Sequence, residues 1–191
     1  MKCLMCESFS FTHICHSCQQ LFLTPKIYKR RLSNNIEVIS FYKYGDIKDL
    51  LHTKHTDLGF YIYATLAELS FKKFADEFHF NEPVVSIPID DNITSGYSHT
   101  ALINNSLKSQ NIKPLFNKLR AKNSLSYSGK SREFRLLNPR DFVLNDFKEE
   151  LVILVDDIVT TGATLSEAAT KLKTQNKEIL FCLTLCDVSK K

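Results

Sequence analysis

Short apolar runs and segments with helical spacing alternate along most of this chain. Four runs are rich in β-branched and aromatic residues and have the length of strands, and two shorter apolar pieces accompany them. The predicted strands cover residues 37–44, 84–89, 151–155 and 179–185, and the shorter pieces cover residues 113–116 and 142–144. The run at 151–155 has no polar position, which is typical of a strand buried on both faces of a parallel sheet.

Predicted helices lie between these strands. Apolar residues recur at intervals of three and four over residues 47–51, 58–78, 95–108 and 165–172. A turn is expected at Gly45 and Asp46, and Asp57 is the expected N-cap of the longest helix. The alternation of strands and helices predicts an α/β domain whose central sheet is mainly parallel.

The length of 191 residues suits one such domain with a small appendage. No apolar run approaches the roughly 18 residues that a membrane span requires. Cys3, Cys6 and Glu7 interrupt the N-terminal residues, where a secretory signal would have its apolar core. We therefore expect a cytoplasmic protein without membrane insertion.

Four of the six cysteines form two C-x2-C pairs near the N-terminus, namely Cys3, Cys6, Cys15 and Cys18. Two such pairs provide the four thiolates of a closed tetrahedral site, so the spacing predicts a structural Zn²⁺. Disulfides or free thiols are the alternative, and a cytoplasmic location disfavours disulfides. We therefore predict a zinc finger at residues 1–24 and a main domain at residues 25–191.

The most informative segment follows the apolar run at 151–155. Two carboxylates, Asp156 and Asp157, end the predicted strand, and a run of small and hydroxylated residues leads into the next helix: Thr160, Thr161, Gly162, Ala163 and Thr164. Unpaired N–H groups at a helix start suit a phosphate, whereas paired carboxylates accept hydrogen bonds from a diol or lie near a divalent cation. A sugar phosphate satisfies both halves. A solvated acidic turn is the simpler alternative, and no ATP-type or dinucleotide motif is present.

This segment resembles the phosphoribosyl pyrophosphate (PRPP) loop of the type I phosphoribosyltransferase family. The resemblance implies that Asp156 and Asp157 bind the ribose hydroxyls. It also implies that residues 160–164 surround the 5′-phosphate. The implied fold is the phosphoribosyltransferase-like α/β fold, and Mg²⁺ would accompany the diphosphate of PRPP.

An N-terminal four-cysteine finger joined to such a domain resembles the layout of the ComF (ComFC) family, whose members are linked to natural transformation. In that layout residues 53–56 form the pyrophosphate loop, with Lys54 facing the diphosphate. The family's Arg-Gly-Phe-Asn-Gln stretch is replaced at residues 95–99 by Ser-Gly-Tyr-Ser-His. The resemblance therefore predicts PRPP binding, but it leaves transferase turnover and the acceptor undecided.

Positive charge is concentrated in two segments. Residues 108–140 carry nine basic and one acidic side chain, and a shorter basic run follows the cysteines. The candidate contacts to single-stranded DNA in these segments are Tyr28, Lys29, Arg30, Arg31, Lys130, Arg132 and Arg135, with Tyr127 as a second aromatic. Two alternatives are that the first run is a solvated connector and that the second serves the diphosphate of PRPP.

Three functions remain open. The first, which the ComF layout favours, is an accessory protein of natural transformation that binds PRPP and handles incoming single-stranded DNA. Cytoplasmic partners such as a helicase belong to that prediction. The second is an active phosphoribosyltransferase of nucleotide metabolism, and the third is a PRPP-sensing regulator that binds nucleic acid.

Overall fold

The computed structural model describes residues 1–89, 96–122 and 139–189. Several predicted features lie outside these residues. They are the start of the helix expected at 95–108, part of the basic segment at 108–140, and the side chains of Tyr127, Lys130, Arg132 and Arg135.

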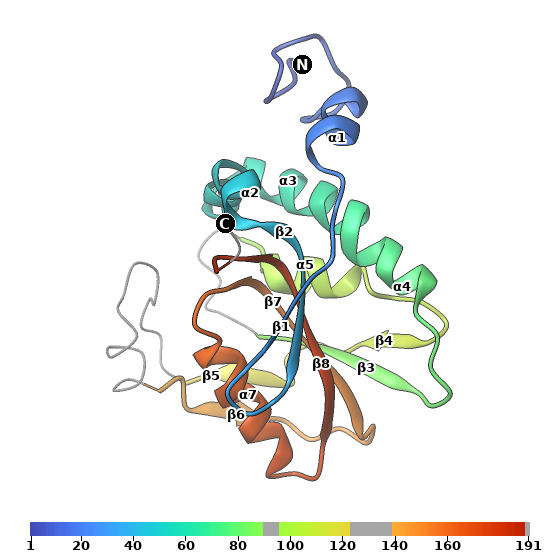
Figure 1. The fold of residues 1–191 in the computed structure, drawn as a ribbon, viewed down its shortest axis with the longest axis vertical. Coiled ribbons are helices and arrows are strands. Elements are labelled where there is room, and N and C mark those ends of the chain that lie inside the picture. The colour runs from blue at the N-terminus through green and yellow to red at the C-terminus, as the bar shows by residue number, and fades with distance from the viewer. Residues whose placement is uncertain (90–95, 123–138, 190–191) are drawn as a thin grey trace.

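A six-stranded sheet forms the centre of the molecule (Figure 1). Its strands are β1 (Tyr28–Arg31), β2 (Glu37–Lys43), β8 (Glu178–Asp187), β7 (Leu151–Val159), β3 (Val84–Pro88) and β4 (Ile112–Pro114), in this spatial order. Every neighbouring pair is parallel except β1 and β2, which are antiparallel. Two short strands, β5 (Leu119–Ala121) and β6 (Phe142–Leu144), form a separate antiparallel pair. The mixed α/β class with a mostly parallel central sheet is therefore confirmed.

Side chains of β7 alternate between two apolar clusters, one on each face of the sheet. Ile153 and Val155 belong to a cluster with the helices of one face, whereas Val152 and Leu154 belong to a second cluster on the opposite face. All four are buried, as the uninterrupted apolar run predicts.

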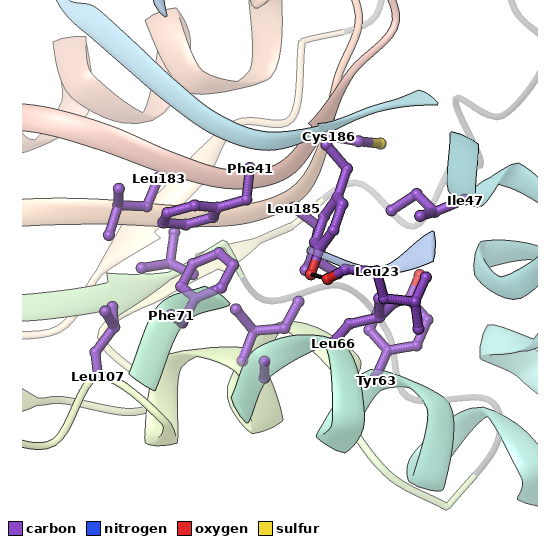
Figure 2. Packing of buried hydrophobic residues seen from close by; sticks show 14 of the residues in the cluster. Leu23, Phe41, Ile47, Tyr63, Leu66, Phe71, Leu107, Leu183, Leu185 and Cys186 are labelled. Atoms are coloured by element: carbon purple, nitrogen blue, oxygen red, sulfur yellow. Dashed lines mark hydrogen bonds between the residues drawn. The ribbon is translucent and has the colours of Figure 1, made fainter. Parts of the chain in front are cut away.

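Helices cover both faces. One face carries α2 (Tyr44–Leu51), α3 (Asp57–Ala67), α4 (Lys73–Glu77) and α5 (His99–Asn105), and the other carries α7 (Ala163–Lys173). Short helical segments η1 (His52–His55) and η2 (Glu68–Lys72) flank α3. Figure 2 shows how Phe41 of β2 meets Phe71 of η2, with ring centroids 4.9 Å apart.

The N-terminal segment, which includes α1 (His16–Phe22), projects from one end of the molecule. It is nevertheless joined to the main core. Ile14, Cys18 and Leu23 are buried in the same apolar cluster as Phe41, and the Tyr42 hydroxyl donates a hydrogen bond of 2.9 Å to the Leu23 carbonyl. A buried contact of this kind fixes the direction in which the segment leaves the domain.

The basic run after the cysteines is not a solvated connector. Residues Tyr28–Arg31 form the edge strand β1, whose side chains alternate between half-buried and exposed positions. The sequence did not indicate this strand, because its residues are mostly long cations. The strand depends on hydrogen bonds to β2.

Several helix boundaries also differ from expectation. The predicted turn at Gly45 and Asp46 is the first turn of α2, and the N-cap of α3 is Thr56, whose hydroxyl accepts a hydrogen bond from the Gly59 N–H. The long predicted helix is interrupted by the π-helical segment η2. In the described residues, no helix has the length and apolar character that crossing a membrane would require.

The contact between Phe41 and Phe71 allows the packing of the core to be tested. Phe71 is fully buried, and replacing it with alanine leaves a cavity that we expect to lower the free energy of unfolding by about 3–5 kcal/mol. Urea denaturation measures this change. Phe80→Ala is the matched control, because Phe80 is 41% exposed and should cost less than about 1 kcal/mol. Equal losses in the two variants would contradict the assignment of Phe71 to the core.

Candidate functional site

The two acids of the predicted ribose site lie within the last part of β7. Strand pairing with β8 continues past them to Val159, so Asp156 and Asp157 are held by a regular ladder. Successive strand residues point to opposite faces, and the two acids differ accordingly. Asp156 is half-buried, whereas Asp157 is buried on the face that carries α3 and α5.

Among the described residues, three side chains lie close to one oxygen of Asp157. Lys54 Nζ and His99 Nε2 each lie 3.3 Å from Asp157 Oδ2, and the Tyr63 hydroxyl lies 3.4 Å from the same atom. The His99 nitrogen is close enough for an ion pair but is not aligned for a hydrogen bond. The cluster therefore joins β7, α3, α5 and η1 through a single carboxylate.

Burial alone raises the pKa of a carboxyl, because it penalises the charged form. At Asp157 this effect is outweighed by His99 and then by the Lys54 ammonium, and together they hold the pKa of Asp157 well below its ordinary value. Burial and the Asp157 charge raise the pKa of Tyr63. The pair Asp157 and Tyr63 is therefore a carboxylate and a neutral phenol at neutral pH.

The backbone that carries Lys54 is fixed as well. The Tyr97 hydroxyl donates a hydrogen bond of 2.9 Å to the Lys54 carbonyl. Gly59 makes room for this contact, since a Cβ there would clash with the Tyr97 hydroxyl and the Thr53 carbonyl oxygen. Lys54 is thus held through its main chain and through its side chain.

The loop after β7 leads directly into the N-terminus of α7. Gly162 has a φ of 81°, in the left-handed region that favours glycine, and immediately precedes α7. The Thr161 hydroxyl accepts a hydrogen bond of 3.3 Å from the Ala163 N–H. Ser166 donates the first intrahelical bond to Gly162, so the N–H groups of Ala163, Thr164 and Leu165 have no intrahelical acceptor.

The basic side chains of β1 take three different environments. Lys29 pairs with Glu37 at 3.0 Å on the surface, and Arg31 donates a hydrogen bond of 3.0 Å to Asn35. Arg30 instead points inward, where its Nε lies 3.2 Å from Asp187 Oδ2. Arg30 is therefore ion-paired within the protein, and its predicted contact with DNA stays a prediction.

Sequence reasoning brought forward Lys54 and the acids, but it missed Tyr63, Tyr97 and His99 as members of this cluster. Aromatic residues at helical spacing are usually core residues, and Tyr63 satisfies that expectation as well. A contact between residues so distant in sequence leaves no local pattern from which it could be predicted.

The four N-terminal cysteines form a separate cluster. Their Sγ atoms all lie within 4.8 Å of one another, and those of Cys6 and Cys15 are 3.7 Å apart. Four thiolates at about 2.3 Å from a zinc ion would be about 3.8 Å apart, so the arrangement fits a tetrahedral Zn²⁺. The predicted convergence of the two C-x2-C pairs is confirmed, while the identity of the metal remains a prediction.

The negative charge of the cysteine thiolates favours a bound cation in this cluster. A hydrogen bond from the Cys15 N–H, 3.3 Å long, lowers the pKa of the Cys3 thiol to about 6. Burial and the neighbouring thiols raise the pKa of Cys18 far above its ordinary value. Four thiolates at this spacing can coexist only with a positive ion between them.

Comparisons with known proteins give structural likeness only. No family model and no curated protein matches the sequence. A hypoxanthine phosphoribosyltransferase from Staphylococcus aureus has a TM-score of 0.43 and 15% identity over 65% of this chain and 62% of its own. An orotate phosphoribosyltransferase from Aeropyrum pernix has a TM-score of 0.40 and 14% identity over 90% and 80%.

An adenine phosphoribosyltransferase gives a TM-score of 0.40 and 15% identity, over 90% of this chain and 89% of that enzyme. This chain spans less than two thirds of the Staphylococcus aureus enzyme. Identities this low do not carry a function from those enzymes to this chain.

The cysteine cluster predicts one tightly held zinc ion in each chain. Cys6→Ser removes a ligand, so we expect loss of the metal together with loss of order in the N-terminal segment. Elemental analysis and the near-ultraviolet spectrum of a cobalt-substituted sample measure this. Cys182→Ser is the matched control, because Cys182 lies in the sheet. Protein purified without chelators that contains no zinc would contradict the assignment.

The Asp157 cluster predicts a pH-dependent contribution to stability. The pKa of Asp157 is lowered by folding, so its contribution is complete above its ordinary pKa and is lost as the pH falls. Asp157→Asn should lower the free energy of unfolding at pH 7 by about 1–3 kcal/mol and flatten its rise from acid pH towards pH 5. Urea denaturation at several pH values measures both effects.

Asp76→Asn provides the control for that comparison. Asp76 pairs with Lys72 on the protein surface, so its replacement should change stability at pH 7 by less than about 0.5 kcal/mol. If Asp157→Asn is no more destabilising than this control, the carboxylate does not organise the cluster.

Proposed function

We propose that this chain binds PRPP or a closely related sugar phosphate between η1 and the loop that follows β7. One observation carries the proposal. Lys54, from the segment expected to face the diphosphate, forms an ion pair with Asp157, from the segment expected to face the ribose, although the two residues are 103 positions apart. The fold thus brings together two segments that the family resemblance assigns to neighbouring parts of one ligand.

The chemistry of each segment supports a complementary ligand. Residues 160–164 offer hydroxyls and the N–H groups at the start of α7 to a 5′-phosphate. Asp157 is buried and its Oδ2 contacts Lys54, His99 and Tyr63, whereas Asp156 is only half-buried. Asp156 is therefore the more accessible of the two acids for hydrogen bonds from the ribose hydroxyls. An ammonium has three N–H donors, so Lys54 can bind Asp157 and a diphosphate oxygen together.

PRPP would enter with Mg²⁺ on its diphosphate, where the ion would neutralise charge and make pyrophosphate a better leaving group. If transfer takes place, the bond from C1′ to the diphosphate oxygen breaks as an acceptor attacks C1′. Lys54 would then stabilise the charge on the departing pyrophosphate. A titration with a panel of nucleobases in the presence of PRPP tests whether the chain is an enzyme or binds PRPP without turnover.

The ribose assignment predicts the effect of a single substitution. Asp156→Asn should weaken PRPP binding at least tenfold, because a hydrogen bond to a charged group contributes about 1.5–3 kcal/mol. The double variant with Asp156→Ala and Asp157→Ala should lose more than about a hundredfold. Isothermal titration with PRPP and Mg²⁺ measures both.

Glu149→Gln is the control for this titration, since Glu149 is a carboxylate that pairs with Lys113 away from the site. It should bind PRPP as the parent does. Full affinity in the double variant would show that the ribose lies elsewhere.

We also propose that the chain binds single-stranded nucleic acid through its N-terminal segment. The supporting observation is a pair of aromatic side chains near the cysteine cluster, Phe9 and Phe11, which are 77% and 90% exposed. Exposed rings of this kind can stack on unpaired bases, and Lys29 on the edge strand β1 can contact phosphate. With the resemblance to the ComF family, this supports a role in natural transformation, in the cytoplasm and beside partners such as a helicase.

Fluorescence anisotropy with a short single strand tests this second proposal. Binding should fall steeply as salt rises, and it should weaken at least fivefold when Phe9 and Phe11 are both replaced by alanine. A second variant, Lys29→Ala with Arg31→Ala, should weaken binding without changing PRPP affinity. Arg30 is excluded because it contacts the loop after β7. No binding by the parent protein at micromolar concentration and low salt would refute the proposal.

A further inference from the structure

Arg30 reaches from the edge strand β1 to the loop that follows β7. Its Nη2 donates a hydrogen bond of 2.7 Å to the Thr160 carbonyl, and its Nη1 lies 3.4 Å from the Ser189 hydroxyl. With the Asp187 ion pair, one guanidinium contacts the loop, the end of β8 and the residues after it.

The hydrogen bond to Thr160 determines the direction of the next N–H group. In a planar trans peptide, the carbonyl of one residue and the N–H of the following residue point in opposite directions. Because Arg30 draws the Thr160 carbonyl towards β1, the Thr161 N–H is directed away from β1. A donor so directed faces the side on which the phosphate of the proposed ligand would lie.

Gly162 shows that the loop lies directly against β1 and the residue after it. A Cβ at this position would clash with Leu32 Cδ2 and would lie 3.6 Å from Arg30 Nη2. Leu32 is buried and packs in the same cluster as Leu165 of α7. Residues 160–162 therefore pack against the edge strand β1 and Leu32, which follows it.

The charge of Arg30 is already balanced. Asp187 is 1% exposed, its Oδ2 faces Arg30, and its Oδ1 accepts hydrogen bonds from the N–H and the hydroxyl of Ser189. A guanidinium with this partner contributes orientation more than positive charge to a nearby anion. Arginine suits such a position, because its rigid fork can hold a carboxylate and a carbonyl at once, which a lysine cannot do.

We propose that Arg30, held by Asp187, is a positioning residue for the phosphate-binding loop. It acts through the Thr160 peptide and does not itself bind the phosphate. The inference rests on the proposed function, since it concerns the same ligand. It assigns a binding role to a residue whose place in a basic run suggested contact with DNA.

Two ligands that each correspond to one part of PRPP can distinguish this positioning role from a general loss of structure. Ribose 5-phosphate would use the loop at residues 160–164, whereas magnesium pyrophosphate would use Lys54. Arg30→Ala and Arg30→Lys should each weaken ribose 5-phosphate binding at least tenfold in isothermal titration, and both should leave magnesium pyrophosphate binding within about twofold. Lys29→Ala, the adjacent cation on β1, should change neither affinity.

Asp187→Asn distinguishes positioning from direct contact. If Arg30 acts through the Thr160 peptide, removal of its anchor lowers ribose 5-phosphate affinity. If Arg30 binds the phosphate directly, removal of the competing carboxylate raises it. An unchanged or increased affinity in Asp187→Asn overturns the proposal, as does an equal loss of both ligands in Arg30→Lys.

A measurement on the protein alone covers the case in which Arg30→Ala does not fold. The amide resonance of Thr161 in a ¹H–¹⁵N spectrum should shift in Arg30→Lys without ligand and remain in place in Lys29→Ala. An unmoved Thr161 resonance in Arg30→Lys overturns the proposal. A parent protein that binds neither ribose 5-phosphate nor PRPP refutes the proposed function itself, and the positioning role with it. Binding by the parent with unaffected variants refutes the positioning role alone.

Discussion

The contact of Lys54 with Asp157 is the interaction on which the arrangement of the candidate site depends. A carboxylate buried on one face of a sheet is costly unless charged and polar partners surround it. Asp157 has three such partners, and each comes from a different element on that face. The need to satisfy one buried charge therefore fixes the positions of η1, α3 and α5 relative to the end of β7.

A second constraint acts on the loop that follows β7. Arg30 and Asp187 join β1 and the end of β8 to the residues that follow Val159. Both clusters are centred at the end of β7, where a parallel sheet exposes the groups available to a ligand. Asp157 positions the Lys54 ammonium, and Arg30 positions the loop whose N–H groups face the ligand. The short loop after β7 therefore follows a strand end fixed by Asp157 and is itself fixed by Arg30.

The parts of the fold that could be predicted from sequence are those with strong local signals. The apolar run of β7 indicates a strand buried on both faces, and the two cysteine pairs converge as their spacing suggests. The edge strand β1 could not be predicted, because its residues have little intrinsic preference for a strand and pair with β2 through the backbone. His99 and Tyr63 were missed for a related reason. Their contact with Asp157 exists only after distant elements pack together, so it leaves no periodic pattern in the sequence.

The central claim is that Lys54, Asp156 and the loop at residues 160–164 bind parts of one sugar phosphate. A crystal structure with PRPP and Mg²⁺ tests this most directly. The account predicts the 5′-phosphate against the N–H groups of residues 161–164, a ribose hydroxyl within hydrogen-bond distance of Asp156, and the diphosphate beside Lys54. A ligand bound elsewhere, or a diphosphate far from Lys54, would contradict it.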